Sequence, residues 1–144
     1  MADKKIELRV IAPTMATDKS PYKFRKDVDM VIMRCKTGDM GILPGRVPCS
    51  VVLDAGVLRI FDESVGVQER HMAIMGGIAH VGDDIVTILS DSAQKPEEID
   101  VEQVNAAIKD ARRRYDETPD LNKKSELCNE IHRYQIRLDV AATK

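Results

Sequence analysis

Hydrophobic residues change their spacing once along this chain, near residues 92–96. Before that point apolar residues alternate with polar ones, as where Ile6, Leu8 and Val10 alternate with charged residues. Such a period of two places every second side chain on one face, which indicates half-buried β-strands. After that point apolar residues recur every three or four positions, as in amphipathic helices. The pattern predicts a β-rich domain, residues 1–92, followed by a helical domain, residues 93–144.

The β-rich domain should contain roughly eight to ten short strands. After the strand around Leu8, we expect a strand in which Val28, Met30 and Ile32 share one face. Strands this short and this regularly spaced indicate an antiparallel β-sandwich or barrel. The remaining predicted strands are residues 50–53, 57–61, 71–75, 78–81 and 85–89.

Glycine, aspartate and serine mark the expected turns between these strands. The signals lie at residues 54–56, 63–64, 76–77 and 82–84. Glycine can adopt the positive φ angles that tight hairpins need, so we expect glycine corners to connect the strands.

The helical domain shows two apolar stripes separated by residues 118–120, Thr-Pro-Asp. Asp100 should cap the first helix, with Gln103 completing a capping-box pattern. Two helices with a short connection predict an antiparallel helical hairpin. Both stripes are narrow, so two such helices alone in water would be only marginally stable. We therefore expect the hairpin to dock on the sandwich or on a partner. The stripes comprise Val101, Val104, Ile108, Ala111 and Tyr115 in the first helix, and Leu127, Ile131, Tyr134, Leu138 and Ala141 in the second.

Composition then narrows the function classes. The chain has 144 residues and a formal net charge of −2, which argues against a dedicated nucleic-acid binder. The sequence has no run of 18 apolar residues, so we expect no transmembrane helix. The N-terminus lacks the apolar region of a signal peptide. The three cysteines form no Cys-x-x-Cys pair, which favours reduced thiols in the cytosol. Any membrane association should therefore come through a protein partner.

No catalytic or metal-binding pattern stands out in the sequence. His71, His80 and His132 do not have the short spacing of metal ligands, and ordinary packing suffices for the two that lie in predicted strands. Gly76-Gly77 lacks the lysine and helix of a phosphate-binding loop. The spacing of the residues suggests no catalytic pair of a nucleophile and a base. We expect no metal, no cofactor and no catalytic residue.

The most distinctive segment is residues 38–48, GDMGILPGRVP. It combines turn-forming glycines and prolines with apolar side chains, whereas an ordinary solvated loop is polar throughout. Glycine can adopt backbone angles that are unfavourable for other residues, and proline fixes φ. We therefore expect a rigid loop that presents Met40, Ile42 and Leu43 to another molecule.

Together with residues 49–60, this segment resembles the signature of the epsilon subunits of F-type ATP synthases. That family typically shows glycine, an acidic residue, an apolar residue, Gly-Ile, Pro-Gly-His and a second proline, ending in a glycine hairpin and Leu-Arg-Ile. Residues 75–81 and 86–93 are weaker matches. The resemblance covers essentially the whole chain, with the sandwich first and the helical hairpin last.

The resemblance implies a non-catalytic rotor subunit of a proton-translocating enzyme. Its sandwich would clamp the gamma shaft and sit on the c-ring, and its helical arm could rise toward the alpha and beta subunits to brake ATP hydrolysis. It would be a peripheral protein on the cytoplasmic side of the energy-transducing membrane. The implied c-ring-facing residues are Asp39, Met40, Gly41 and Ile42. The implied gamma contacts are Leu43, Pro44, Gly45, Arg46, Val47 and Pro48.

Two positions depart from the family pattern. Arg46 replaces the usual histidine, so a permanently charged guanidinium should change the pairing with gamma. Some relatives bind ATP through Ile/Leu-Asp-x-x-Arg-Ala and a nearby glutamate, for which this chain has Gln94. Losing the arginine removes a charge-assisted phosphate contact, so we expect weak ATP binding or none. The corresponding residues here are Ile99, Asp100, Gln103 and Val104.

Basic residues on the predicted arm allow two interpretations. They form either a solvated helix face or a patch that grips acidic segments of the catalytic beta subunits. Consecutive helical residues point in different directions, so at most two of the three arginines at 112–114 share a face. The candidates are Arg112, Arg113, Lys123, Arg133 and Arg137.

Three hypotheses on function follow. The first is a rotor subunit that joins gamma to the c-ring. The alternative is a nucleotide sensor whose hairpin folds down when ATP binds. An enzyme built on a small sandwich is the third, and no residue pattern supports it.

Overall fold

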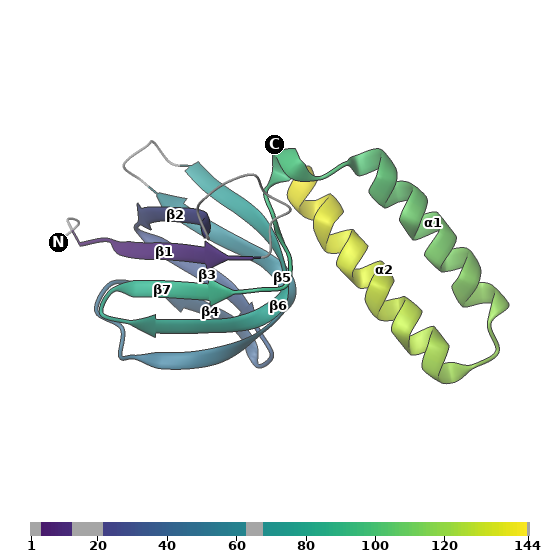
Figure 1. Cartoon of the computed structure of the whole chain (residues 1–144), viewed down its shortest axis with the longest axis horizontal. Coiled ribbons are helices and arrows are strands. Elements are labelled where there is room, and N and C mark those ends of the chain that lie inside the picture. The colour runs from purple at the N-terminus through teal and green to yellow at the C-terminus, as the bar shows by residue number, and fades with distance from the viewer. Residues whose placement is uncertain (1–3, 13–21, 63–67, 144) are drawn as a thin grey trace. The chain divides into compact units, whose positions relative to one another are not determined.

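The computed structural model describes residues 4–12, 22–62 and 68–143. The chain forms two compact units, Met1–Ala93 and Gln94–Lys144. The first unit is a β-sandwich and the second a pair of helices (Figure 1). The predicted combination of a sandwich with a helical hairpin is therefore confirmed.

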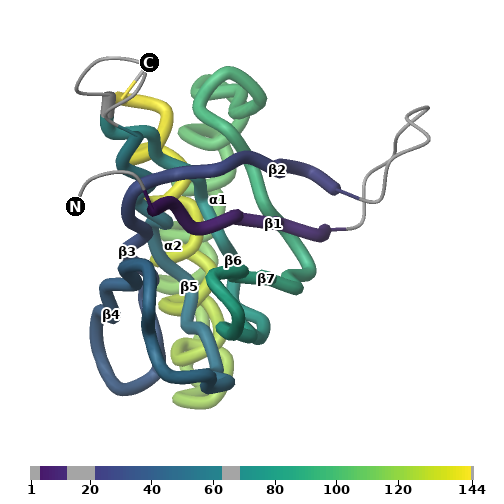
Figure 2. Tube along the Cα trace, turned by 90° about the vertical axis from the view of Figure 1, so that its left-hand side faces the viewer, coloured from purple at the N-terminus to yellow at the C-terminus, as the bar shows by residue number. Residues whose placement is uncertain are grey.

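Eight strands make up the described part of the sandwich. They follow the order β2-β1-β7-β6-β5-β3-β4 (Figures 1 and 2). The short β8 also pairs with β6. The strands are β1 Ile6–Ile11, β2 Tyr22–Val28, β3 Met30–Cys35, β4 Gly38–Ile42, β5 Cys49–Asp62, β6 Gln68–Gly82, β7 Ile85–Leu89 and β8 Ala93–Gln94.

One pairing departs from the predicted antiparallel arrangement. β1 runs parallel to β7, with Leu8 opposite Val86 and Ile11 opposite Leu89. These strands are far apart in the sequence, so no hairpin turn forces them to run in opposite directions. The prediction holds for the other main pairs, including β5 with β6 along nearly their whole length.

The predicted strand in which Val28, Met30 and Ile32 share a face is wrong. The chain bends at Asp29, whose N–H donates to the Phe61 carbonyl at 2.9 Å. β2 therefore ends at the buried Val28, and β3 begins after the bend with its own alternation of buried and accessible positions. In β3 the buried residue nearest the bend is therefore Val31, not Met30 or Ile32.

Two of the predicted glycine turns are also wrong, because β5 and β6 continue through residues 54–56 and 76–77. A Cβ added to Gly77 would overlap the Leu89 carbonyl oxygen, and one added to Gly56 would press on the Arg34 side chain. Glycine therefore allows close approach between strands at these positions. The turn at residues 82–84 is confirmed, while residues 63–64 lie outside the described residues.

The core between the two layers is built from aliphatic and methionine side chains. Phe24 packs only partly against it. This composition follows from the sequence, which has no tryptophan and few aromatic residues. The largest fully buried side chains are Ile6, Leu8, Met33, Ile42, Leu58, Ile60, Met72 and Ile88.

The second unit contains the short 3-10 helix η2, Pro96–Glu98, and the helices α1, Val101–Glu117, and α2, Leu121–Ala141. Asp100 caps α1 by accepting from the Gln103 N–H at 3.2 Å, as predicted. Asp120 caps α2 in the same way through the Asn122 N–H. Neither helix is apolar enough over sufficient length to cross a membrane.

The predicted stripes describe α1 better than α2. Val104, Ile108 and Ala111 are buried, whereas Val101 and Tyr115, at the two ends of the first stripe, are exposed. In α2 the buried set includes Ile136 and Val140, which the predicted stripe omits. Because α2 contacts η2 as well as α1, it buries a wider arc than one narrow stripe.

Candidate partner-binding surface

The first half of the predicted loop is a strand. Residues 38–42 form β4, which pairs with β3 and places Ile42 opposite Val31. Ile42 is completely buried, and Met40 packs partly against the core. The prediction that these two side chains are presented to a partner is therefore wrong, because pairing with β3 turns them inward. Leu43 is exposed as predicted.

Asp39 and Gly41 lie on the accessible side of β4, which ends the strand order of the sheet. The Asp39 carboxylate lies 3.3 Å from the Arg34 guanidinium on the neighbouring strand. Both partners of this ion pair are largely exposed, so it contributes little stability. The Asp39 carboxylate thus remains accessible for a contact with another protein.

Residues 43–48 form the β4–β5 loop. Leu43 and Val47 are exposed by 57% and 78%, although both are apolar. Gly45 adopts a φ of +84°, and its N–H donates to the Asp84 Oδ1 at 2.7 Å. Arg46 donates to the Gly41 carbonyl at 3.5 Å. These contacts hold the loop while two apolar side chains face solvent.

Strand pairing brings together a second apolar surface that the sequence did not reveal. Val52 lies opposite Ile78, and Ile78 lies opposite Leu89. Residues opposite each other on neighbouring strands share a face, so the three side chains form one continuous line. They are exposed by 56%, 53% and 51%. We call these three residues the apolar row.

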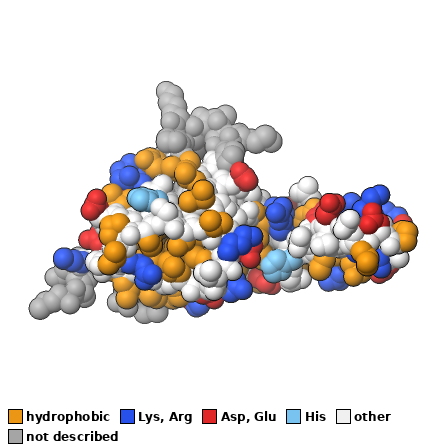
Figure 3. All heavy atoms as spheres, turned by 90° about the horizontal axis from the view of Figure 1, so that it is seen from below, with side chains coloured by type: hydrophobic (Ala, Val, Ile, Leu, Met, Phe, Trp, Pro, Cys, Tyr) orange, Lys and Arg blue, Asp and Glu red, His pale blue; other side chains and the backbone are white. Residues whose placement is uncertain are grey.

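A polar row runs beside the apolar row on the same strands. Ser50 lies opposite His80, which lies opposite Thr87. The Ser50 Oγ and the His80 Nδ1 are 2.9 Å apart. Figure 3 shows one face of the molecule, where hydrophobic side chains gather on the sandwich among scattered Lys and Arg. Apolar and polar rows side by side can both attract and orient a partner.

The three histidines have different surroundings, and His80 lies beside Ser50 as described above. His71 lies 2.7 Å from the Glu69 carboxylate, and His132 is exposed on α2. Within the described ranges, no group of three His, Cys, Asp or Glu residues is arranged to hold a metal ion.

The residues at the predicted nucleotide motif take part in the start of α1. Ile99 and Val104 are buried, and the Asp100 carboxylate accepts the Gln103 N–H as the helix cap. The Gln103 side chain is exposed. One oxygen of the Asp100 carboxylate thus serves as the helix cap, and position 103 carries an amide side chain rather than a guanidinium.

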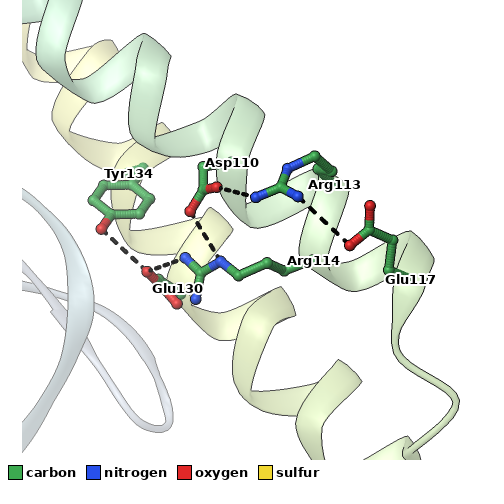
Figure 4. A network of polar contacts seen from close by, with 6 residues as sticks. All are labelled: Asp110, Arg113, Arg114, Glu117, Glu130 and Tyr134. Atoms are coloured by element: carbon green, nitrogen blue, oxygen red, sulfur yellow. Dashed lines mark hydrogen bonds and ion pairs between the residues drawn. The ribbon is translucent and has the colours of Figure 1, made fainter.

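Some of the candidate basic residues of the hairpin are engaged within it. Arg113 pairs with Asp110 at 2.8 Å and with Glu117 at 3.6 Å (Figure 4). The Arg137 guanidinium lies over the Tyr134 ring, 5.5 Å from its centroid. Arg112, Lys123 and Arg133 are exposed. Lys123 also lines a groove of about 480 Å³ near the helix connection.

Arg114, which the sequence analysis did not select, joins the two helices. Its guanidinium lies 2.9 Å from Asp110 on α1 and 3.5 Å from Glu130 on α2 (Figure 4). Glu130 also accepts the Tyr134 hydroxyl at 3.1 Å. Hydrogen bonding to Arg113, with the nearby Arg114 charge, lowers the pKa of Asp110. Burial and the bond to Glu130 raise the pKa of Tyr134.

Comparison with known proteins gives a consistent result. The family model described as "ATP synthase, Delta/Epsilon chain, beta-sandwich domain" matches residues 6–96. The ATP synthase epsilon chain of Bacillus velezensis is 34% identical over 137 residues, which cover 95% of this chain and 96% of that relative. The epsilon chain of Prochlorococcus marinus is 32% identical over 139 residues, covering 94% and 97%.

Solved structures agree with this result. A chain of the Euglena gracilis mitochondrial ATP synthase, in a structure of OSCP, F1 and the c-ring, aligns with a TM-score of 0.60 at 26% identity, covering 98% of this chain and 82% of that one. A chain from the central stalk and c-ring of the Tetrahymena thermophila mitochondrial enzyme shares the fold, with a TM-score of 0.57 at 15% identity, covering 98% and 99%. The family model matches more than half of this chain, and the curated relatives align with it over nearly their whole length. This chain therefore belongs to the ATP synthase delta/epsilon chain family.

Proposed function

We propose that this chain is a non-catalytic central-stalk subunit that links the gamma shaft of an F-type ATP synthase to its c-ring. The observation that carries the proposal is the apolar row, which lies on the sandwich of a chain from this family. A rotor subunit needs a lasting contact with the shaft, and an exposed line of aliphatic side chains suits such a contact.

The energetics favour a covered apolar row. Contiguous exposed apolar patches on soluble proteins commonly mark interaction sites. Full burial of an aliphatic side chain is worth about 1.5–3 kcal/mol. Val52, Ile78 and Leu89 are each about half exposed, so a partner could gain a few kcal/mol from the three together. We assign the apolar row and the exposed Leu43 and Val47 to the gamma contact.

The other partners are assigned by position and charge. Asp39, accessible at the sheet edge, is the proposed contact to the polar loops of the c-ring. Arg112, Lys123 and Arg133 are the proposed contacts of the hairpin to the alpha and beta subunits, through which the helices would regulate ATP hydrolysis. These contacts would hold the chain peripherally at the cytoplasmic side of the membrane without insertion.

The nucleotide-sensor alternative receives less support. The Asp100 carboxylate is used in capping α1, and position 103 offers a glutamine where ATP-binding relatives have an arginine. A phosphate there would lack a charge-assisted partner. Weak ATP binding or none therefore remains our expectation.

Binding to purified gamma subunit tests the proposal. Ile78→Lys places a charge in the centre of the apolar row and should weaken the affinity for gamma at least about tenfold, since about 1.4 kcal/mol corresponds to a factor of ten. Leu121→Lys is the matched control, because Leu121 is 81% exposed on α2, outside the row. The control should bind like the parent chain. Equal affinity of all three proteins for gamma would contradict the proposal.

A further inference from the structure

The contacts of Asp84 assign it a role beyond that of a turn residue. Asp84 lies in the turn between β6 and β7, next to Asp83, and the two have φ angles of 59° and 52°. Residues other than glycine seldom adopt positive φ, although aspartate tolerates it better than most. This backbone suits a tight hairpin, and it fixes the direction in which the Asp84 side chain leaves the turn.

Asp84 connects three separate segments of the sandwich. Its carboxylate accepts the Gly45 N–H at 2.7 Å, across 39 residues of sequence. Its backbone carbonyl accepts the Glu7 N–H of β1 at 2.9 Å. A single residue thus joins the β4–β5 loop, the β6–β7 turn and the neighbouring β1.

Apart from the long hydrogen bond from Arg46 to the Gly41 carbonyl, the β4–β5 loop has few other ways to be fixed. Pro44 and Pro48 have no N–H to donate, and Leu43 and Val47 are largely exposed. The Gly45 N–H is therefore a principal donor of the loop, and a carboxylate acceptor makes its hydrogen bond stronger than a neutral one. Gly45 can offer this N–H because glycine accepts a φ of +84° without strain.

A packing contact supports the same connection. A Cβ built on Gly82, in the same turn, would lie 3.6 Å from the Pro48 Cβ. Pro48 at the end of the loop therefore lies close to the turn. The turn and the loop meet at two points, one polar and one apolar.

We propose that Asp84 is the positioning residue that holds the β4–β5 loop in its binding conformation, with Leu43 and Val47 exposed before the partner arrives. A loop ordered in advance loses less conformational freedom on association, which improves affinity. The proposal rests on the proposed function in one respect: it takes the gamma subunit as the partner that meets this loop.

Asp84→Gly is the decisive variant, and Asp83→Gly is its matched control. Glycine retains the left-handed backbone at both positions, but only the first variant loses the carboxylate that holds Gly45. In the free protein, Asp84→Gly should accelerate hydrogen exchange of the Gly45 amide about tenfold or more. It should also weaken binding to purified gamma several-fold. Asp83→Gly should leave both quantities near those of the parent chain.

Asp84→Asn gives an independent measurement if the glycine variant fails to fold. Its amide oxygen can still accept the Gly45 N–H without charge assistance, so exchange and affinity should fall between the parent and Asp84→Gly. Amides of the β5–β6 ladder should keep their protection in each folded variant.

The outcomes separate this inference from the proposed function. Unchanged Gly45 exchange in Asp84→Gly, or in Asp84→Asn where only that variant folds, would overturn the positioning role. Faster exchange with unchanged affinity for gamma would equally overturn it, because the loop would then not serve the contact. A parent chain that fails to bind gamma would refute the proposed function, while faster exchange in the variant would still support the connection between Asp84 and the loop.

Discussion

Leu8 and Ile88 are completely enclosed in the sandwich, whereas α1 buries mainly Val104, Ile108 and Ala111 along one narrow line. The sandwich combines a broad aliphatic core with the long β5–β6 ladder. An ion pair from Arg114 to Glu130 adds a polar contact between the two helices beside the narrow apolar line of α1. The difference indicates that the sandwich is built to remain rigid, while the hairpin lies closer to the limit of stability.

The strongest test of the rigid part is Gly77→Ala. The added Cβ would overlap the Leu89 carbonyl oxygen, and alanine would have to adopt a φ of +127°. Clash and strain together should lower the free energy of unfolding by about 4 kcal/mol. Denaturant titration measures this loss. Gly41→Ala is the control, since its added Cβ would have no atom within 4 Å beyond Gly41 and its two chain neighbours, and it should cost less than about 1 kcal/mol. Similar losses from both would contradict this account of β6.

Core truncation compares the two units directly. Leu8→Ala should destabilise the sandwich by about 3–4 kcal/mol, because a fully enclosed cavity cannot collapse easily. Ile108→Ala should cost the hairpin about 2 kcal/mol, since its narrow seam is bordered by solvent. Denaturant titration followed by amide exchange in each unit separates the two losses. A greater loss from the hairpin variant would reverse the comparison.

The smallest expected effect concerns the polar contact between the helices. Glu130→Gln weakens the bonds to Arg114 and Tyr134 and should lower the stability of the hairpin by about 0.5–1 kcal/mol. Glu117→Gln is the control, because Glu117 pairs with Arg113 on its own helix and should matter less. Thermal unfolding followed by far-UV circular dichroism measures both. Equal losses of stability in the two variants would mean that the contact between the helices stabilises the hairpin no more than a pair within one helix.

The sequence predicted those features that depend on near neighbours. The Asp100 cap and the turn at residues 82–84 are predicted correctly, because each depends on residues close together in the chain. The two periods correctly separate the strand-rich part from the helical part, but the period of two fails where the bend at Asp29 interrupts it. The helical hairpin followed from the same local patterns.

Features that depend on distant partners were missed. Ile42 was expected to face another molecule, but β3 pairs with β4 and turns this residue into the core. The Gly76-Gly77 pair predicts a turn, because the sequence does not show that Gly77 lies close to Leu89. The apolar row needs the register of three strands, and the Arg114 contact needs the position of the second helix.

The parallel pairing of β1 with β7 bears on how the protein is made. β1 leaves the ribosome well before β7, its neighbour in the sheet, which ends at Leu89. The sandwich can close only after nearly all of its sequence has been synthesised. Contacts over such sequence distances slow folding. The nascent chain must therefore wait with an open sheet edge, which is the stage at which aggregation is the greatest hazard.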